Sequence, residues 1–380
     1  MKPIHDIFIC FIAFFLCIAI GFSLMTGKQQ DFSEVENRSL QTLKMNQILN
    51  GEIFSILNTF CSDQFPARQN FLLLSSLINR TLDNSEANGI IIGKDGYLIS
   101  RHDYPNFTIL NKNIASIKSF LKEQSSKQIQ TKILIAPRTV DVMKSKLPSL
   151  FPKDYGTYEY EIIKQNINEE QLINSIDHLK YYADIGEEIY YKTDHHWTTH
   201  GAYRAYEQIV PHFDFLPYKQ DYFDIQCISN EFYGTTHSKS LLKKTSADKL
   251  YLYRYNGDEK IRLICSDKID SEKNFCSFYD LSVINENKKD KYKVFLSGNT
   301  DLLLIRNQTS NLPKLLLIKD SFANSVIPFL ALHYDIDVID LRYYKSSVKD
   351  YINKNEFDSV LLLYGIDTLA TDISCSYILK

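Results

Sequence analysis

The chain lacks an excess of positive charge and lacks any regular cysteine motif. Over 380 residues the net charge is −3, which argues against a protein that binds nucleic acid by neutralising phosphates. There are seven cysteines and no Cys-x-x-Cys pair. Cys10 and Cys17 lie in an apolar run, which leaves an odd number elsewhere. Cys265 and Cys276 could pair, but the fold cannot depend on a dense disulfide framework.

The longest uncharged stretch is at the N-terminus. Residues 7–25, IFICFIAFFLCIAIGFSLM, are 19 apolar or uncharged residues, enough to cross the hydrocarbon core of a bilayer as a helix. No good small-x-small cleavage site follows, and a cleavable signal usually has a shorter apolar run. We therefore expect an uncleaved signal anchor over residues 1–28, with a cleaved signal peptide as the alternative. The rest of the chain would then be the extracytoplasmic part of a single-pass cell-membrane protein.

Beyond this run, helical and strand-like segments alternate. Residues 29–88 read as a polar segment followed by helices, and residues 89–100 as a hairpin around a Lys-Asp-Gly turn. Short apolar runs then alternate with amphipathic stretches over 89–380, which predicts an α/β three-layer sandwich with a mostly parallel sheet. The β-rich composition around 215–290 indicates an insertion in this domain. No repeat of 20–50 residues is visible.

The single tryptophan lies in a histidine-rich stretch, YYKTDHHWTTHGAYRAY, at residues 190–206. If residues 193–197 are extended, Asp194 and His196 point to one side and His195 to the other. A carboxylate near an imidazole can hold its tautomer and stabilise its protonated form. Asp194 and His196 are therefore a candidate orienting acid and base. The alternative is that these residues only fill the turn before a helix.

A metal site is a further interpretation of the same stretch. His196 and His200 have the His-x-x-x-His spacing that places two ligands on one helical face. However, the glutamate of a His-Glu-x-x-His motif is absent, and no third zinc ligand can be named. The sequence therefore favours a site without metal.

Two more groups of polar residues follow apolar runs. Ser321 comes after LLLIKD and opens a helix-like segment. In α/β proteins, ligands and reacting groups bind beyond the carboxyl ends of the strands. The N–H groups at a helix N-terminus can also stabilise an oxyanion. Ser321 would supply the nucleophile that Asp194 and His196 lack, but by itself it could be a helix cap. Gly298 and Asn299 follow VFLS and are suitable oxyanion donors, or a plain turn.

Taken in order, TDHHWTTHGAY, IKDSFANSVIPFL and VIDLRYY resemble the DHHW protein family, which is similar to SGNH hydrolases and related to the alginate O-acetyltransferases. SEVENRSL, FPAR, GKDGYL, EFYGT and SGN fit as well. The resemblance implies an SGNH-like catalytic domain over 89–380 with a Ser-His-Asp triad. Ser321 would be the nucleophile, His196 the base and Asp194 its orienting acid.

The same resemblance assigns Gly298 and Asn299 to the oxyanion block. The sequence departs from ordinary SGNH hydrolases in two ways. Its Asp-x-His segment precedes the serine, as if the order were permuted, and its serine block is Lys-Asp-Ser instead of Gly-Asp-Ser.

The function implied is extracytoplasmic O-acetylation of a cell-surface or secreted polysaccharide through an acyl-serine intermediate. No acetyl-CoA motif is visible, so no cofactor is expected, and a membrane-bound O-acyltransferase partner would supply the acyl group. No nucleic-acid partner is expected. A glycan esterase or deacetylase with the same residues is one alternative, and a non-catalytic glycan-binding scaffold is another.

Overall fold

The computed structural model describes most of the chain from residue 27 to residue 379. The ranges left out are 34–37, 45–46, 48–52, 82–84, 103–106, 150, 152–155, 157, 243–244, 266–276, 285–289 and 309–310. Before residue 27 only residues 11, 14, 15 and 21 are described. The signal anchor predicted over residues 1–28 therefore lies almost wholly outside the described residues, as does Cys276. Within the described ranges, no helix has the length and apolar composition that a bilayer span requires.

Contacts divide the chain into two compact units, 1–90 with 237–244, and 91–236 with 245–380. The first unit contains the short strands β1 (Phe32–Ser33) and β2 (Arg38–Ser39), which pair antiparallel, and the helices α3 (Ile53–Asp63) and α4 (Arg68–Thr81). The Asp63 carboxylate accepts the Gln41 N–H at 2.8 Å, which attaches the polar segment to the end of α3.

The second unit is built on a seven-stranded sheet with the order β10-β11-β13-β12-β14-β6-β7. The strands are β6 (Gln130–Ala136), β7 (Leu172–Ile173), β10 (Ile261–Cys265), β11 (Leu302–Asn307), β12 (Lys314–Lys319), β13 (Asp335–Ile339) and β14 (Ser359–Gly365). Strands β13, β12, β14, β6 and β7 run parallel, while β11 is antiparallel to β13 and β10 to β11. The predicted α/β class is confirmed, with a mixed sheet.

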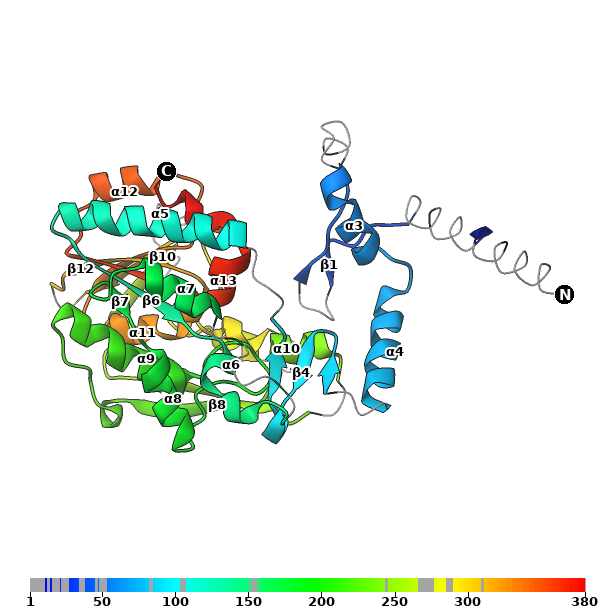
Figure 1. Ribbon diagram of the computed structural model, residues 1–380. Helices are drawn as coiled ribbons and strands as arrows, with labels where there is room; N and C mark the ends of the chain where they lie inside the picture. The colour runs from blue at the N-terminus through cyan, green and yellow to red at the C-terminus, as the bar shows by residue number, and fades with distance from the viewer. Residues whose placement is uncertain are drawn as a thin grey trace. The chain divides into compact units, whose positions relative to one another are not determined.

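Helices cover both faces of this sheet. On β12, Leu315 and Leu317 belong to one buried cluster and Leu316 and Ile318 to the other, because successive side chains of a strand point to opposite faces. The first cluster packs under α6 (Thr139–Val142), α8 (Ile176–Asp184), α9 (Thr199–Ile209) and α11 (Ile327–Leu330). The second packs under α5 (Phe107–Ser126), α7 (Tyr158–Asn166), α12 (Val348–Lys354) and α13 (Ile366–Thr371). In Figure 1, α5 and α12 are seen on one side of the sheet and α8 and α9 on the other.

Smaller elements complete the second unit. Strands β8 (Asp224–Phe232) and β9 (Asp248–Arg254) form a separate antiparallel pair, and β10 belongs to the main sheet. The hairpin predicted over 89–100 is present as β4 (Ile90–Ile92) and β5 (Leu98–Ser100). The N–H of Gly93 donates to the carbonyl of Tyr97 at 2.7 Å and closes its turn.

Candidate active site

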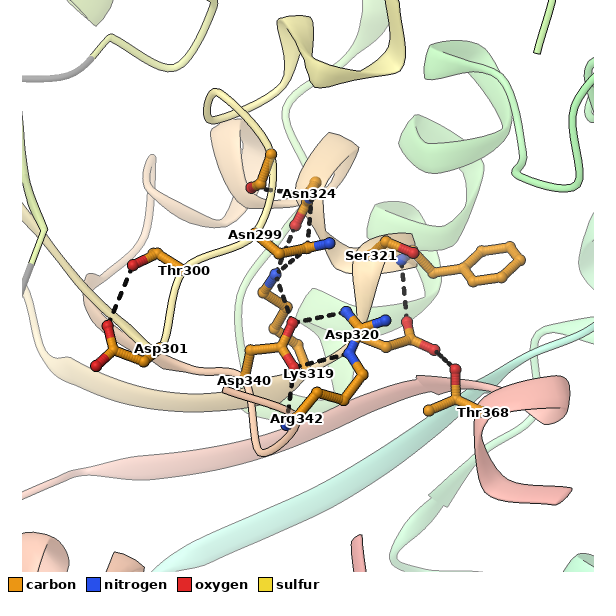
Figure 2. A network of polar contacts seen from close by, with 12 residues as sticks. Asn299, Thr300, Asp301, Lys319, Asp320, Ser321, Asn324, Asp340, Arg342 and Thr368 are labelled. Atoms are coloured by element: carbon orange, nitrogen blue, oxygen red, sulfur yellow. Dashed lines mark hydrogen bonds and ion pairs between the residues drawn. The ribbon is translucent and has the colours of Figure 1, made fainter. Parts of the chain in front are cut away.

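Ser321 lies just beyond the carboxyl end of β12, at the first position of the short 3₁₀ helix η9 (Ser321–Ser325). The cap of this helix is Asp320, whose Oδ1 accepts the Phe322 N–H at 3.0 Å. Its Oδ2 accepts the Gly365 N–H at 2.8 Å and the Thr368 hydroxyl at 2.6 Å (Figure 2). The helix-cap alternative for Ser321 is therefore wrong, because Asp320 performs that role and ties η9 to the end of β14.

The histidine-rich stretch is held in an irregular turn before α9. Thr198 caps α9 by accepting the Gly201 N–H at 3.0 Å, and an antiparallel bridge joins Tyr190 to Trp197. The indole N–H of Trp197 donates to the Phe322 carbonyl at 3.1 Å and to the Ser325 hydroxyl at 3.0 Å. The tryptophan is fully buried. It therefore connects the histidine segment directly to the turn that carries Ser321.

Asp194, His196 and Ser321 form an unbroken line of hydrogen bonds. The Asp194 Oδ1 to His196 Nδ1 distance is 2.6 Å, and the His196 Nε2 to Ser321 Oγ distance is 2.8 Å. Asp194 and His196 are buried, while Ser321 is partly exposed. The structure therefore brings together the three residues that the sequence named, although Ser321 lies 125 residues from His196.

The second oxygen of Asp194 is held as well. Oδ2 accepts the backbone N–H of Thr235 at 2.7 Å and its hydroxyl at 2.9 Å. Burial alone would raise the pKa of Asp194, but the imidazoles of His195 and His196 and the hydrogen bonds from His196 and Thr235 outweigh it, so this pKa lies well below its usual range. A Cβ at position 234 would collide with Asp194, so the close approach of this turn requires Gly234.

The ring of His196 also has a fixed plane. It stacks on Tyr292 with ring centroids 3.8 Å apart and an angle of 4° between the planes. The Tyr292 hydroxyl donates to the Ser321 carbonyl at 3.3 Å, and burial raises the pKa of this tyrosine well above its usual value. Tyr292 therefore stays neutral and gives the imidazole an apolar surface to lie against.

The metal interpretation does not fit the position of His200. Its Nδ1 lies 2.8 Å from the Tyr253 hydroxyl and its Nε2 lies 2.6 Å from Glu187, so both ring nitrogens already have partners away from His196. Asp194, His195 and His196 do have ligand atoms within 4.8 Å of one another. However, a 2.6 Å distance between Asp194 Oδ1 and His196 Nδ1 is that of a direct hydrogen bond, and two zinc ligands at about 2.0 to 2.2 Å from the metal would be further apart.

Gly298 and Asn299 lie in a turn that contacts the Ser321 segment. Gly298 has a φ of 104°, and its N–H already donates to the Phe295 carbonyl at 3.1 Å. The Oδ1 atom of Asn299 accepts from Lys319 Nζ at 2.8 Å and from Asn324 Nδ2 at 3.2 Å (Figure 2). Asn299 is thus tied to residues on both sides of Ser321, while Gly298 provides the left-handed turn.

Three residues of the site were not among the sequence candidates. Thr235 was present only as the last letter of EFYGT, and Lys319 only as the departure from Gly-Asp-Ser. Tyr292 lies in the lysine-rich stretch NENKKDKYK and carried no signal of its own. Their roles depend on contacts across the fold, so no local pattern could have named them.

Comparison with protein families gives a match over the part of the chain that contains these residues. The sequence model described as DHHW protein matches residues 151–339. The resemblance to the DHHW protein family is confirmed. The matched DHHW segment includes Asp194, His196 and Ser321, and also Gly298 and Asn299.

Solved structures resemble the chain at the level of the fold. A DHHW family protein from Eubacterium siraeum DSM 15702 superimposes with a TM-score of 0.63 and 19% identity, covering 78% of this chain and 97% of that one. Bacillus cereus PatB1 gives 0.61 and 19%, covering 75% and 98%. At these identities the similarity shows a shared fold.

Among curated proteins, the probable alginate O-acetylase AlgJ of Pseudomonas fluorescens is 22% identical over 170 residues. The match covers 43% of this chain and 43% of AlgJ, so the chain spans less than half the length of this relative.

Proposed function

We propose that this DHHW-family chain is an O-acetyltransferase that acetylates a hydroxyl group of a polysaccharide through an acyl-serine intermediate. The observation that carries the proposal is the hydrogen-bonded line from Asp194 through His196 to the partly exposed Ser321. Such an arrangement activates a serine hydroxyl for acyl transfer. Similarity to a probable alginate O-acetylase suggests acetyl as the group and a polysaccharide as the acceptor.

In the first half-reaction, the Ser321 Oγ attacks the carbonyl carbon of a donor ester while His196 Nε2 takes its proton. Asp194 holds the Nδ1–H and stabilises the imidazolium that forms. Collapse of the tetrahedral intermediate breaks the bond to the donor oxygen, which leaves with the proton from His196. An ester of Ser321 remains.

In the second half-reaction, a sugar hydroxyl attacks the acyl-serine carbonyl and gives its proton to His196. When the intermediate collapses, the acyl group stays on the sugar and Ser321 Oγ recovers the proton. The developing oxyanion in both steps would be met by the Asn299 amide and by the Ser321 N–H, which is at a helix N-terminus where N–H groups have no partner inside the helix.

Two rival functions use the same fold. A glycan esterase would pass the acyl group to water instead of a sugar, and a glycan-binding scaffold would form no acyl-enzyme. The test incubates the purified full-length chain with p-nitrophenyl acetate, with and without a polysaccharide acceptor. We expect one acetyl group on Ser321 by peptide mass spectrometry, its absence from Ser321→Ala, and transfer to the acceptor. Release of acetate alone would favour the esterase, and an unmodified serine would favour the scaffold.

We also propose that the catalytic domain is extracytoplasmic, behind a signal anchor over residues 1–28, and receives its acyl group from a membrane-bound O-acyltransferase. The support is the apolar run over 7–25 and the absence of an acetyl-CoA motif. Membrane fractionation with external protease tests the topology. Recovery of a soluble form that begins near residue 27 would show a cleaved signal instead.

A further inference from the structure

We propose that Lys319 is a positioning residue for the transferase reaction, because it holds the side-chain amide of Asn299 in the one orientation that presents its N–H₂ group to the reacting carbonyl. This inference rests on the proposed function, since it assigns Asn299 to the oxyanion. Lys319 is only 2% exposed. Its Nζ lies 2.8 Å from the Oδ1 atoms of both Asn299 and Asn324.

The chemistry of the ammonium group determines the orientation of the amide. A lysine ammonium has three donors and no acceptor, whereas an asparagine amide has an acceptor oxygen and a donor nitrogen. The oxygen of Asn299 must therefore face Lys319, and Nδ2 must point the other way. Asn324 reinforces this orientation, because its own Nδ2 also donates to the Asn299 oxygen at 3.2 Å. Figure 2 shows the amide nitrogen of Asn299 turned from Lys319 toward the side where Ser321 is drawn.

A reversed amide would oppose the reaction. With Oδ1 directed at the reacting carbonyl, a lone pair would meet the developing negative charge where a donor is required. An asparagine on a turn can rotate its amide, and Asn299 is exposed. The ammonium group of Lys319 has no hydrogen-bond acceptor, so it disfavours the reversed orientation of the Asn299 amide. It does so more strongly than a neutral hydrogen-bonding group, because charged hydrogen bonds are roughly twice as strong as neutral ones.

The charge of Lys319 is compensated by a buried carboxylate. Asp340, at the end of β13, is fully buried and lies 3.4 Å from Lys319 Nζ. Arg342 forms two hydrogen bonds to the same carboxylate, at 2.9 and 2.6 Å (Figure 2). Asp340 would therefore remain paired if Lys319 lost its charge, so the lysine can be removed without leaving a buried carboxylate alone.

The protonation state of Lys319 changes near neutral pH. Burial lowers the pKa of Lys319 to about 8; Asp340 and Asp320 act against this, and Arg342 acts with it. Below this pH the ammonium is present and the amide is held. Above it the neutral amine can accept a hydrogen bond, so both amide orientations become available and turnover falls. The lysine would thus produce an alkaline limb in the kcat profile.

The experiment compares Lys319→Met, Asn299→Ala and the double variant in turnover of p-nitrophenyl acetate by the full chain. Methionine keeps the length of the side chain and removes its donors. Lys132→Met is the matched control, because Lys132 is a half-buried lysine that donates to the Glu170 carbonyl at the other end of the parallel strands. Thermal unfolding of each variant accompanies the kinetics.

We expect Lys319→Met to lower kcat by about tenfold to a hundredfold with KM changed less than about twofold, since the lost interaction acts in the transition state. In the double variant the loss should equal that of Asn299→Ala alone. The alkaline limb near pH 8 should disappear in both single variants, and Lys132→Met should match the wild type.

Additive losses, or an alkaline limb that persists in Asn299→Ala, would overturn the assignment. The pH profile of Asn299→Ala needs only a substitution at an exposed position, so it tests the role of Lys319 even if Lys319→Met does not fold. Ser321→Ala distinguishes failure of the proposed function from failure of the role assigned to Lys319. If Ser321→Ala retains turnover, the proposed function itself fails; if it abolishes turnover while Lys319→Met is fully active, only the role of Lys319 fails.

Discussion

Two polar networks involve the segment around Ser321, and each is built on one buried charge, with the two charges of opposite sign. On one side the buried anion Asp194 orients the imidazole of His196, and on the other the buried cation Lys319 orients the amide of Asn299. In each, a buried charged residue holds a polar side chain that the proposed reaction would use, the imidazole that contacts Ser321 Oγ and the amide of Asn299. Under the proposed function, the anionic network would direct proton transfer and the cationic network would direct oxyanion binding.

The two networks differ in how the chain assembles them. Asp194 and His196 are two residues apart in one turn, so the anionic network is almost local. The cationic network collects Lys319 from the end of β12, Asn299 from the turn before β11, and Asp340 from the end of β13. If both are needed for catalysis, damage to the anionic network should remove the nucleophile's activation, while damage to the cationic network should leave a slower enzyme.

The largest effect should come from the residues that exchange the proton. We expect His196→Ala and Ser321→Ala each to reduce ester turnover by at least about ten-thousand-fold, and the double variant to be little worse, because the two act as a unit. Stopped assays with p-nitrophenyl acetate measure the three rates. Multiplicative losses in the double variant would show that the two residues do not share one mechanism.

Removing the charge of the anionic network should come next. Asp194→Asn keeps the shape but can leave His196 in the wrong tautomer, so we expect about a ten-thousand-fold lower kcat with little change in KM. Asp372→Asn is a matched control, because Asp372 also accepts a backbone N–H, from Ser374 at 2.7 Å, but does so at the cap of η10 (Ile373–Tyr377). If Asp194→Asn lowers kcat only slightly, and by as much as Asp372→Asn, then the carboxylate of Asp194 does not orient His196 for the reaction.

The same variant has a pH-dependent effect on folding. The depressed pKa of Asp194 means that its carboxylate stabilises the folded chain above the unfolded pKa of about 3.9, and that this stabilisation is lost as pH falls through the lower folded pKa. The difference in unfolding free energy between the wild type and Asp194→Asn should therefore shrink in acid. Denaturant titrations at neutral and acidic pH measure it, and a difference that grows in acid would be contrary to this assignment.

The cationic network should show a smaller effect through Asn299. Removing one oxyanion donor costs about a hundredfold to a thousandfold in kcat, so Asn299→Ala should fall between Asp194→Asn and the wild type. Asn168→Ala is a control of the same type, since Asn168 also accepts through Oδ1 in an exposed turn, from the Glu170 N–H at 3.0 Å. Full activity of Asn299→Ala would remove this network from the mechanism.

The smallest effect should come from His195, the residue between the two members of the anionic pair. Its Nδ1 lies 2.7 Å from the Thr235 hydroxyl, and its ring lines a small hollow with Phe322 and Asp367. The ring nitrogen that lies 2.8 Å from Ser321 Oγ belongs to His196 and not to His195. His195→Ala should therefore lower ester turnover by less than about tenfold, well short of His196→Ala. Equal losses in the two variants would mean that the wrong histidine was named as the base.

Local chemistry in the sequence was enough to name the two halves of the anionic network. The spacing of Asp194 and His196 predicted their pairing on the assumption that residues 193–197 are extended. The pair is present, but that assumption was wrong, because these residues form an irregular turn. The apolar run before Ser321 predicted a strand end, which the structure confirms as the end of β12. The same prediction for Gly298 was wrong, because the run before it contains the 3₁₀ helix η8 (Lys291–Val294) and Gly298 lies in the turn that follows. The alternation of runs predicted the α/β class, which the structure confirms. The catalytic roles of these residues stay predictions until the variants are measured.

Only the tertiary structure decided which groups meet. Parallel neighbours β12 and β14 place Asp320, the residue before Ser321, beside Thr368, and the buried indole of Trp197 places His196 against Ser321 across 125 residues. The tie between Lys319 and Asn299 depends in the same way on strand order, since β11 and β12 are separated in the sheet by β13. A local pattern encodes which side chains are present, whereas the direction of a buried hydrogen bond depends on every element packed around it. For that reason Asp194 and His196 could be paired from the sequence, and Lys319 could not be assigned to Asn299 without the fold.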